Sequence, residues 1–128
     1  MKGNSIISLE DIIDRPVRVL DVPGVGKVKV RDPTGEDKLE AMKDAKQDPR
    51  WDQLDEAGRA ALVSDFLTLR MIVEPKITKE DYYKGNYLKL SQIIEAVFLD
   101  YQIRVLSLRK KRHKQIMDFL ELTKESLL

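Results

Sequence analysis

No glycine or proline follows Gly85 in this chain of 128 residues. Beyond that position, apolar residues recur every three or four places, which is the spacing of one face of a helix. The residues of this stripe are Leu90, Ile94, Val97, Tyr101, Val105 and Leu108. The pattern predicts a single helix over residues 87–124. At 1.5 Å per residue it is roughly 55 Å long, which is more than the diameter of a domain of this size.

A basic run interrupts the apolar stripe. The next stripe position is Arg112, and the cations of the run are Arg109, Lys110, Lys111, Arg112 and Lys114. Six residues turn through more than a full circle of helix, so residues 109–114 leave no face apolar. Apolar spacing then resumes at Ile116, Met117, Phe119, Leu120 and Leu122.

Two arrangements of the chain after the basic run stay open. In the first, residues 116–122 fold back onto the core. In the second, the helix end projects and exposes an apolar patch, which is typical of a surface for a partner or for a second copy. We therefore take as hypothetical partner-binding residues Arg109, Lys110, Lys111, Arg112, Lys114, Ile116, Met117, Phe119 and Leu120.

Charge is segregated along the chain, although the formal net charge is only +1. Residues 1–103 carry 16 basic and 19 acidic side chains, residues 104–114 sum to +6, and residues 115–128 sum to −2. Such segregation favours a directed interaction. The near-neutral total argues against nucleic-acid binding by the whole surface. A small nucleic-acid-binding regulator that uses residues 109–114 stays as an alternative, although the run has no aromatic side chains for base stacking.

The length of the chain predicts a single domain over residues 1–128. The sequence contains no cysteine, so disulfides and thiolate zinc sites are excluded and a reducing compartment fits. The first residues lack the apolar run of a signal peptide, and no stretch is apolar enough to span a membrane. We expect a soluble cytoplasmic protein without a membrane partner.

Valines alternate with polar residues on both sides of Pro23-Gly24-Val25-Gly26, which predicts a β-hairpin over residues 17–31. Two strands alone are marginally stable in water, so the hairpin must pack on helices or pair with another chain. Val28 and Val30 are therefore expected to mark a self-association edge.

Capping patterns open further helices. Thr34 with Asp37 opens a helix over 34–46, and Thr78 with Asp81 opens one over 79–84. Ser8 could cap a short turn within residues 5–14, which we interpret as either a short helix or an ordered lead-in. Another apolar stripe predicts a helix over 54–73, after a polar loop anchored by Trp51. The expected fold is mainly α (α+β): a small N-terminal hairpin on a bundle of three to five helices, with a long C-terminal helix.

No residue pattern indicates catalysis, a metal or a cofactor. The segment Gly24-Val25-Gly26-Lys27 lacks the first glycine and the Ser or Thr of a phosphate loop. His113 is the only histidine, and no second metal-ligand type accompanies it. The acidic clusters at residues 52–56 and 80–81 lie at helix starts, where capping explains them. We expect a protein that is not an enzyme and has no cofactor.

Three segments carry a resemblance to a known family. They are Val28–Ala41, with the sequence VKVRDPTGEDKLEA, then Met71–Asp81, with MIVEPKITKED, and Leu90–Val97, with LSQIIEAV. In this order and spacing they resemble the tail assembly chaperones of long-tailed bacteriophages, over roughly residues 26–100. Residues 104–114 and the apolar end have no counterpart in the family pattern.

The resemblance implies a non-catalytic protein of the bacterial host cytoplasm. Family members bind the tape-measure protein, help recruit tail-tube subunits, self-associate, and are absent from the finished particle. Many are also made in a longer, frameshifted form. An alternative within the same class is a phage morphogenesis adaptor of the head–tail connector type.

Overall fold

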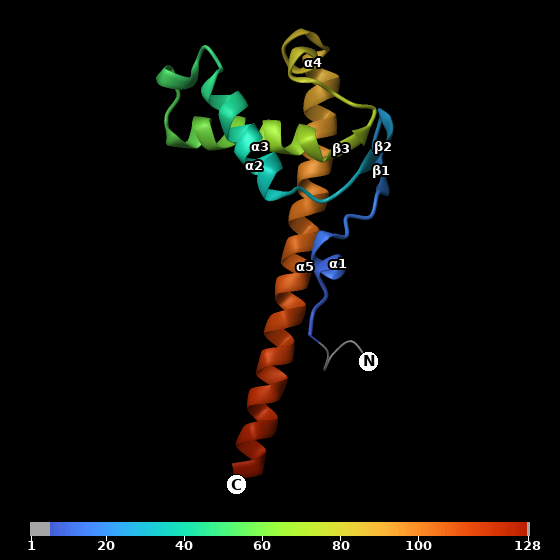
Figure 1. Ribbon diagram of the computed structural model, residues 1–128, viewed down its shortest axis with the longest axis vertical. Coiled ribbons are helices and arrows are strands. Elements are labelled where there is room, and N and C mark those ends of the chain that lie inside the picture. Colours follow the sequence, from blue (N-terminus) through green and yellow to red (C-terminus); the bar gives the residue numbers. More distant parts are fainter. Residues whose placement is uncertain (1–5, 128) are drawn as a thin grey trace.

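The computed structural model describes residues 6–127, with side chains described to residue 121. It confirms a mainly α fold with a small sheet near the N-terminus and a long C-terminal helix (Figure 1). The elements in chain order are α1 (Leu9–Ile13), β1 (Arg18–Val22), β2 (Gly26–Val30), α2 (Gly35–Lys46), the 3₁₀ turn η2 (Trp51–Gln53), α3 (Glu56–Met71), β3 (Ile72–Glu74), α4 (Lys79–Lys84) and α5 (Tyr87–Leu127).

The predicted hairpin forms where the valines alternate. Strands β1 and β2 pair antiparallel, from Arg18 opposite Val30 to Val22 opposite Gly26. Gly24 has φ 78° and Gly26 has φ 145°, a region that side chains with a Cβ rarely adopt. The two glycines therefore allow the chain to reverse within the turn.

The sheet has a third strand that the sequence analysis missed. The helix predicted over 54–73 ends at Met71, and residues 72–74 form β3, which pairs antiparallel with β2. The strand order is β1-β2-β3, so β2 is the middle strand. Val28 and Val30 are both buried, and the expectation that they form a self-association edge is wrong. Val30 pairs with Arg18 on one side and with Ile72 on the other, and Val28 pairs with Leu20 of β1.

Reciprocal caps fix the starts of three helices. At α2, the Thr34 hydroxyl accepts from the Asp37 N–H at 3.1 Å, and the Asp37 carboxylate accepts from the Thr34 N–H at 2.9 Å. Ser8 with Asp11 and Thr78 with Asp81 repeat the arrangement at α1 and α4. Each pair satisfies two backbone donors that a helix start otherwise leaves without partners.

The core lies where α3 crosses the first half of α5, between α2 on one side and the sheet on the other (Figure 1). Phe66 on α3, Val97 on α5 and Val30 on β2 are among its most buried side chains. Trp51 packs against the edge of this core, with the Arg59 guanidinium 4.8 Å from its ring centre. This confirms the expected anchor in the loop after α2.

Helix α5 runs without interruption from Tyr87 to Leu127. At 1.5 Å per residue, this is a length of about 60 Å. Figure 1 shows its first half inside the domain and its second half extending away from it. Of the two arrangements left open by the sequence, the projecting one is therefore found.

Candidate interaction surface

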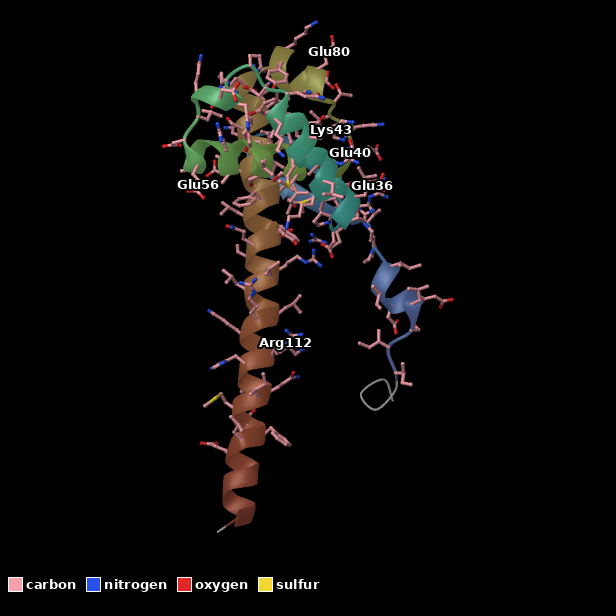
Figure 2. The ribbon with its side chains drawn as sticks, turned by 60° about the vertical axis from the view of Figure 1, so that its left-hand side comes forward. Glu36, Glu40, Lys43, Glu56, Glu80 and Arg112 are labelled. Carbon is pink, nitrogen blue, oxygen red and sulfur yellow. The ribbon has the colours of Figure 1, made fainter. Side chains whose placement is uncertain are left out.

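The second half of α5, residues 105–127, forms a projection that we call the stalk (Figure 2). Stalk side chains from residue 106 to residue 121 are all exposed. The predicted stripe is at least partly buried from Leu90 to Val105, the first stalk residue, but Leu108 is 66% exposed. The apolar stripe thus leaves the core four residues before its first basic member, Arg112.

The predicted basic run forms a positive collar around the stalk, consisting of Arg109, Lys110, Lys111, Arg112 and Lys114. All five side chains are exposed. Within the described part of the chain, none of them makes an ion pair or a side-chain hydrogen bond. Figure 2 shows Arg112 reaching out from the helix. The collar therefore offers five unpaired cations to an approaching anionic group.

Beyond the collar lies an apolar patch formed by Ile116, Met117, Phe119 and Leu120. At 100° per residue, these four side chains occupy an arc of about 160° around the helix. Asp118 and Glu121 lie on the opposite face. Between roughly half and two-thirds of each apolar side chain is exposed. An amphipathic helical surface of this kind, outside any core, is typical of a docking site for another helix.

A shallow hollow lies on α5 at the domain-proximal end of the collar. Val105, Leu108, Arg109 and Arg112 line it, and its volume is about 350 Å³. An apolar floor flanked by two guanidinium groups suits an apolar side chain that has carboxylates beside it.

Helix α1 forms a second exposed apolar element, which the sequence analysis did not single out as a site. We call residues 6–14 the arm. Every arm residue is exposed, including Ile6, Leu9, Ile12 and Ile13. Figure 2 shows α1 standing clear of α5. A helix of five residues has too few hydrogen bonds to be stable by itself in water. Burial against other elements stabilises short helices in proteins, and the exposed arm lacks such burial.

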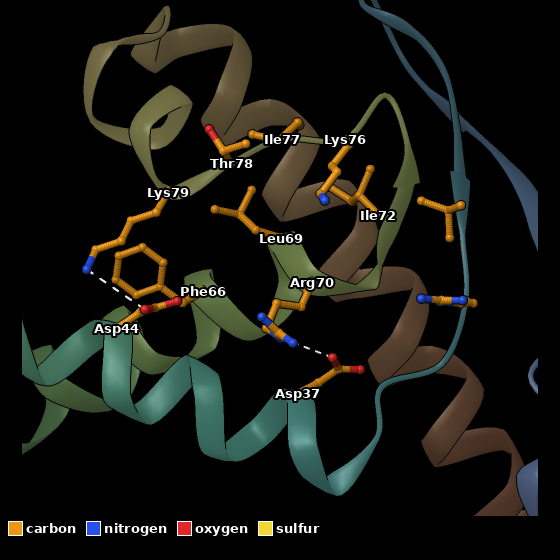
Figure 3. Close-up of a pocket in the computed structure, with 12 residues that line it drawn as sticks. Asp37, Asp44, Phe66, Leu69, Arg70, Ile72, Lys76, Ile77, Thr78 and Lys79 are labelled. Carbon is orange, nitrogen blue, oxygen red and sulfur yellow. Dashed lines mark hydrogen bonds and ion pairs between the residues drawn. The ribbon is translucent and has the colours of Figure 1, made fainter.

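A hollow with a volume of about 470 Å³ lies between α2, α3 and the chain that leads into α4 (Figure 3). Its carboxylates bind neighbouring cations. Asp37 accepts from Arg70 Nε at 3.0 Å and from Arg15 Nη2 at 3.1 Å, and Asp44 lies 3.8 Å from Lys79 Nζ. Burial alone would raise the pKa of Asp37, but hydrogen bonds from Thr34 and Arg70 lower it below its ordinary value. These ion pairs connect α2 to α3, to Arg15 and to the start of α4, and they have a structural role.

A buried carboxylate closes the loop between α2 and α3. Asp48 accepts hydrogen bonds from the Arg50 N–H at 2.8 Å, from Arg50 Nε at 3.1 Å and from the Tyr83 hydroxyl at 2.6 Å. The Arg50 hydrogen bond holds the pKa of Asp48 well below its usual range, despite burial. Burial and the bond to Asp48 raise the pKa of Tyr83 to about 12. From the sequence alone, Asp48 with Pro49 predicts only the end of the helix over 34–46.

The acidic clusters are explained by structure. Asp55 caps α3 by accepting from the Gly58 N–H at 2.7 Å, and the Thr78 N–H lowers the pKa of Asp81 in its cap.

Among the residues that the structure describes, no three His, Cys, Asp or Glu side chains are grouped as a metal site would require. Within the same residues, no helix combines the length and apolar character needed to cross a membrane.

Comparisons with protein families, with curated proteins and with solved structures give no match to this chain.

Proposed function

We propose that this protein is a non-catalytic assembly chaperone of the phage-tail type, which binds a tape-measure protein and helps recruit tail-tube subunits. The class of assembly chaperone is taken from the resemblance over residues 26–100. The observation that supports a binding role is the stalk, which carries an apolar patch outside the domain core and a collar of cations that have no ion-pair partner among the described residues. A chaperone for a long helical client needs exposed amphipathic surface that stays accessible while the domain remains folded.

The stalk suits a helical client because its two features act at different ranges. The charges of the collar attract an acidic segment over about 10 Å at ordinary ionic strength. The patch then contributes short-range burial, at about 25 cal/mol per Å² of apolar surface. Weak separate contributions make the complex reversible, as assembly requires.

Co-expression with a tape-measure fragment, followed by pull-down, tests the proposal. We expect capture by the unchanged chain and loss of capture when Ile116, Met117 and Leu120 are all replaced by serine. The control replaces Leu39, an exposed apolar residue on α2, and should leave capture intact. Equal capture by the triple variant contradicts the assignment of the stalk. No capture by the unchanged chain contradicts the tape-measure client.

A second measurement separates an assembly chaperone from a component that stays in the particle. Mass spectrometry of purified particles should find the tape-measure protein but not this chain. Its presence at a fixed ratio would favour the head–tail connector type of adaptor.

The unpaired collar also favours one competing function, a nucleic-acid-binding regulator. That function predicts an affinity for duplex DNA that falls steeply between 50 mM and 200 mM salt, because each neutralised phosphate releases counterions. Replacing Arg109 and Arg112 with glutamine should then reduce the salt slope. DNA binding with that behaviour, together with no capture of the tape-measure fragment, would replace the chaperone proposal.

A further inference from the structure

The arm and the stalk of this chain are complementary surfaces that do not touch. In the arm, Leu9, Ile12 and Ile13 lie within about 100° of one another around α1, and Glu10, Asp11 and Asp14 surround them. On the stalk, Val105 and Leu108 form an apolar floor with Arg109 and Arg112 beside it. The arm therefore presents apolar side chains with acids beside them, and the stalk presents apolar side chains with cations beside them.

The base of the arm is fixed to the domain. Arg15 donates from Nε to the Asp32 carbonyl at 2.7 Å and from Nη2 to the Asp37 carboxylate at 3.1 Å. Asp14, directly before it, has extended backbone, so α1 leaves the domain in a defined direction. Figure 2 shows that this direction carries α1 away from the stalk of its own chain.

We propose that the arm of one copy docks on the stalk of a second copy. The arm's apolar side chains lie over Val105 and Leu108, and Glu10 and Asp14 pair with Arg109 and Arg112. The charges specify the partner: two stalks repel each other through their collars, and two arms repel each other through their acids, whereas an arm and a stalk attract. This contact shares Arg109 and Arg112 with the proposed client surface, but it leaves Lys110, Lys111 and Lys114 and the patch residues Ile116, Met117 and Leu120 uncovered, so the two proposals are tested separately.

The absence of cysteine from the chain permits a direct test by disulfide crosslinking. Two single variants, Ile12→Cys and Leu108→Cys, are made with tags of different mass, mixed and oxidised mildly. A disulfide requires Cα atoms about 6 Å apart, so a mixed dimer reports a close arm–stalk contact between copies. The matched control replaces Leu108→Cys with Leu39→Cys, because Leu39 and Leu108 are similarly exposed, at 69% and 66%.

We expect the mixed dimer with Leu108→Cys to form at least several times faster than the one with Leu39→Cys. Equal rates overturn the proposal, because they indicate random collision. The double variant Ile12→Cys/Leu108→Cys distinguishes the two possible locations of the arm. A predominant internal disulfide in single chains would place the arm on its own stalk, and would also overturn the proposal.

Charge exchange provides an independent measurement. Reversing Arg109 and Arg112 to glutamate should slow mixed-dimer formation by roughly tenfold or more, because like charges then meet in the contact. Reversing Glu10 and Asp14 to arginine as well, in the arm-bearing partner, should restore the rate. All these residues are exposed, and circular dichroism checks that each variant keeps its helices. If neither charge reversal changes the rate of mixed-dimer formation, the contact is not the one proposed.

Discussion

The guanidinium of Arg104 on α5 lies 2.6 Å from the carboxylate of Asp32, which follows β2. Among the described residues, no ion pair lies further along α5. The same Asp32 accepts from Arg15 through its carbonyl oxygen. This aspartate therefore connects the base of the arm to the point where the stalk leaves the domain, and it divides α5 into a part that stabilises the fold and a part that remains available for binding.

This division predicts different costs for the same substitution at two sites in one helix. Ile94 is 8% exposed and Ile116 is 52% exposed. Ile94→Ala should lower the free energy of unfolding by about 2–4 kcal/mol, because it leaves a cavity in the core. Ile116→Ala should change it by less than about 0.5 kcal/mol. Urea denaturation followed by circular dichroism measures both, and similar losses would contradict the assignment of Ile116 to a free stalk.

Removal of the buried charge at Asp48 should destabilise the domain. Asp48→Asn keeps the size of the side chain but replaces an acceptor that faces Arg50 and Tyr83 with an amide. We expect a loss of about 1–3 kcal/mol, the cost of leaving buried polar groups poorly paired. Asp52→Asn, at an exposed position in the same loop, is the control and should be close to neutral. Equal effects would show that the Asp48 hydrogen bonds add nothing.

Acid should weaken the folded state through the same carboxylate. The pKa of Asp48 is lower in the folded protein than the ordinary aspartate value of 3.8. The unfolded chain therefore binds more protons in this pH range, and acidification favours unfolding. The contribution is fully present above about pH 4 and disappears as the pH falls through the lower folded value. Asp37 acts in the same direction, whereas burial raises the pKa of Asp65 and opposes it.

The measurement for this pH dependence is a series of urea titrations of the unchanged chain and of Asp48→Asn. The difference between their unfolding free energies should be constant near neutral pH and should shrink below pH 4. A difference that stays constant into strong acid would show that the folded carboxylate has an ordinary pKa.

Two glycines predict opposite responses to alanine. A Cβ on Gly85 would lie 2.5 Å from the Asp81 carbonyl oxygen and 2.8 Å from Leu90 Cδ1. Gly85→Ala should therefore shift the turn between α4 and α5 and cost about 1–3 kcal/mol. Around Gly35 nothing lies within 4 Å of the added carbon, and Gly35→Ala should be neutral or slightly stabilising at a helix start. Thermal unfolding compares them, and a harmless Gly85→Ala would mean that the turn adjusts freely.

Local chemistry explains which elements the sequence predicted. Caps such as Thr34 with Asp37 act across three residues, and the hairpin closes within a few residues of its turn, so each pattern is complete within a short window. The structure confirms the hairpin, the capped helices and the long α5 with small differences at their ends. The projection of the stalk was not decided by the local pattern: a ring of cations cannot be buried without partners, but residues 116–122 beyond it could still have folded back onto the core.

Contacts between distant residues explain what the sequence did not predict. Strand β3 is only three residues long, and it is defined by pairing Ile72 with Val30 and Glu74 with Lys29, which no local alternation reveals. The wrong edge at Val28 and Val30 follows from that omission. In the same way, Asp37 and Asp48 have visible local roles as a cap and a helix stop, but Arg70 and Tyr83 reach them only in the folded chain.

The length of α5 has a consequence for any study of this protein in solution. A stalk of about 35 Å that projects from a small globule gives the molecule more hydrodynamic drag than a sphere of the same 14.8 kDa. A single copy will therefore elute from a gel-filtration column with the Stokes radius of a heavier particle. Only methods that report molar mass independently of shape, such as light scattering or sedimentation equilibrium, can count the copies in an assembly.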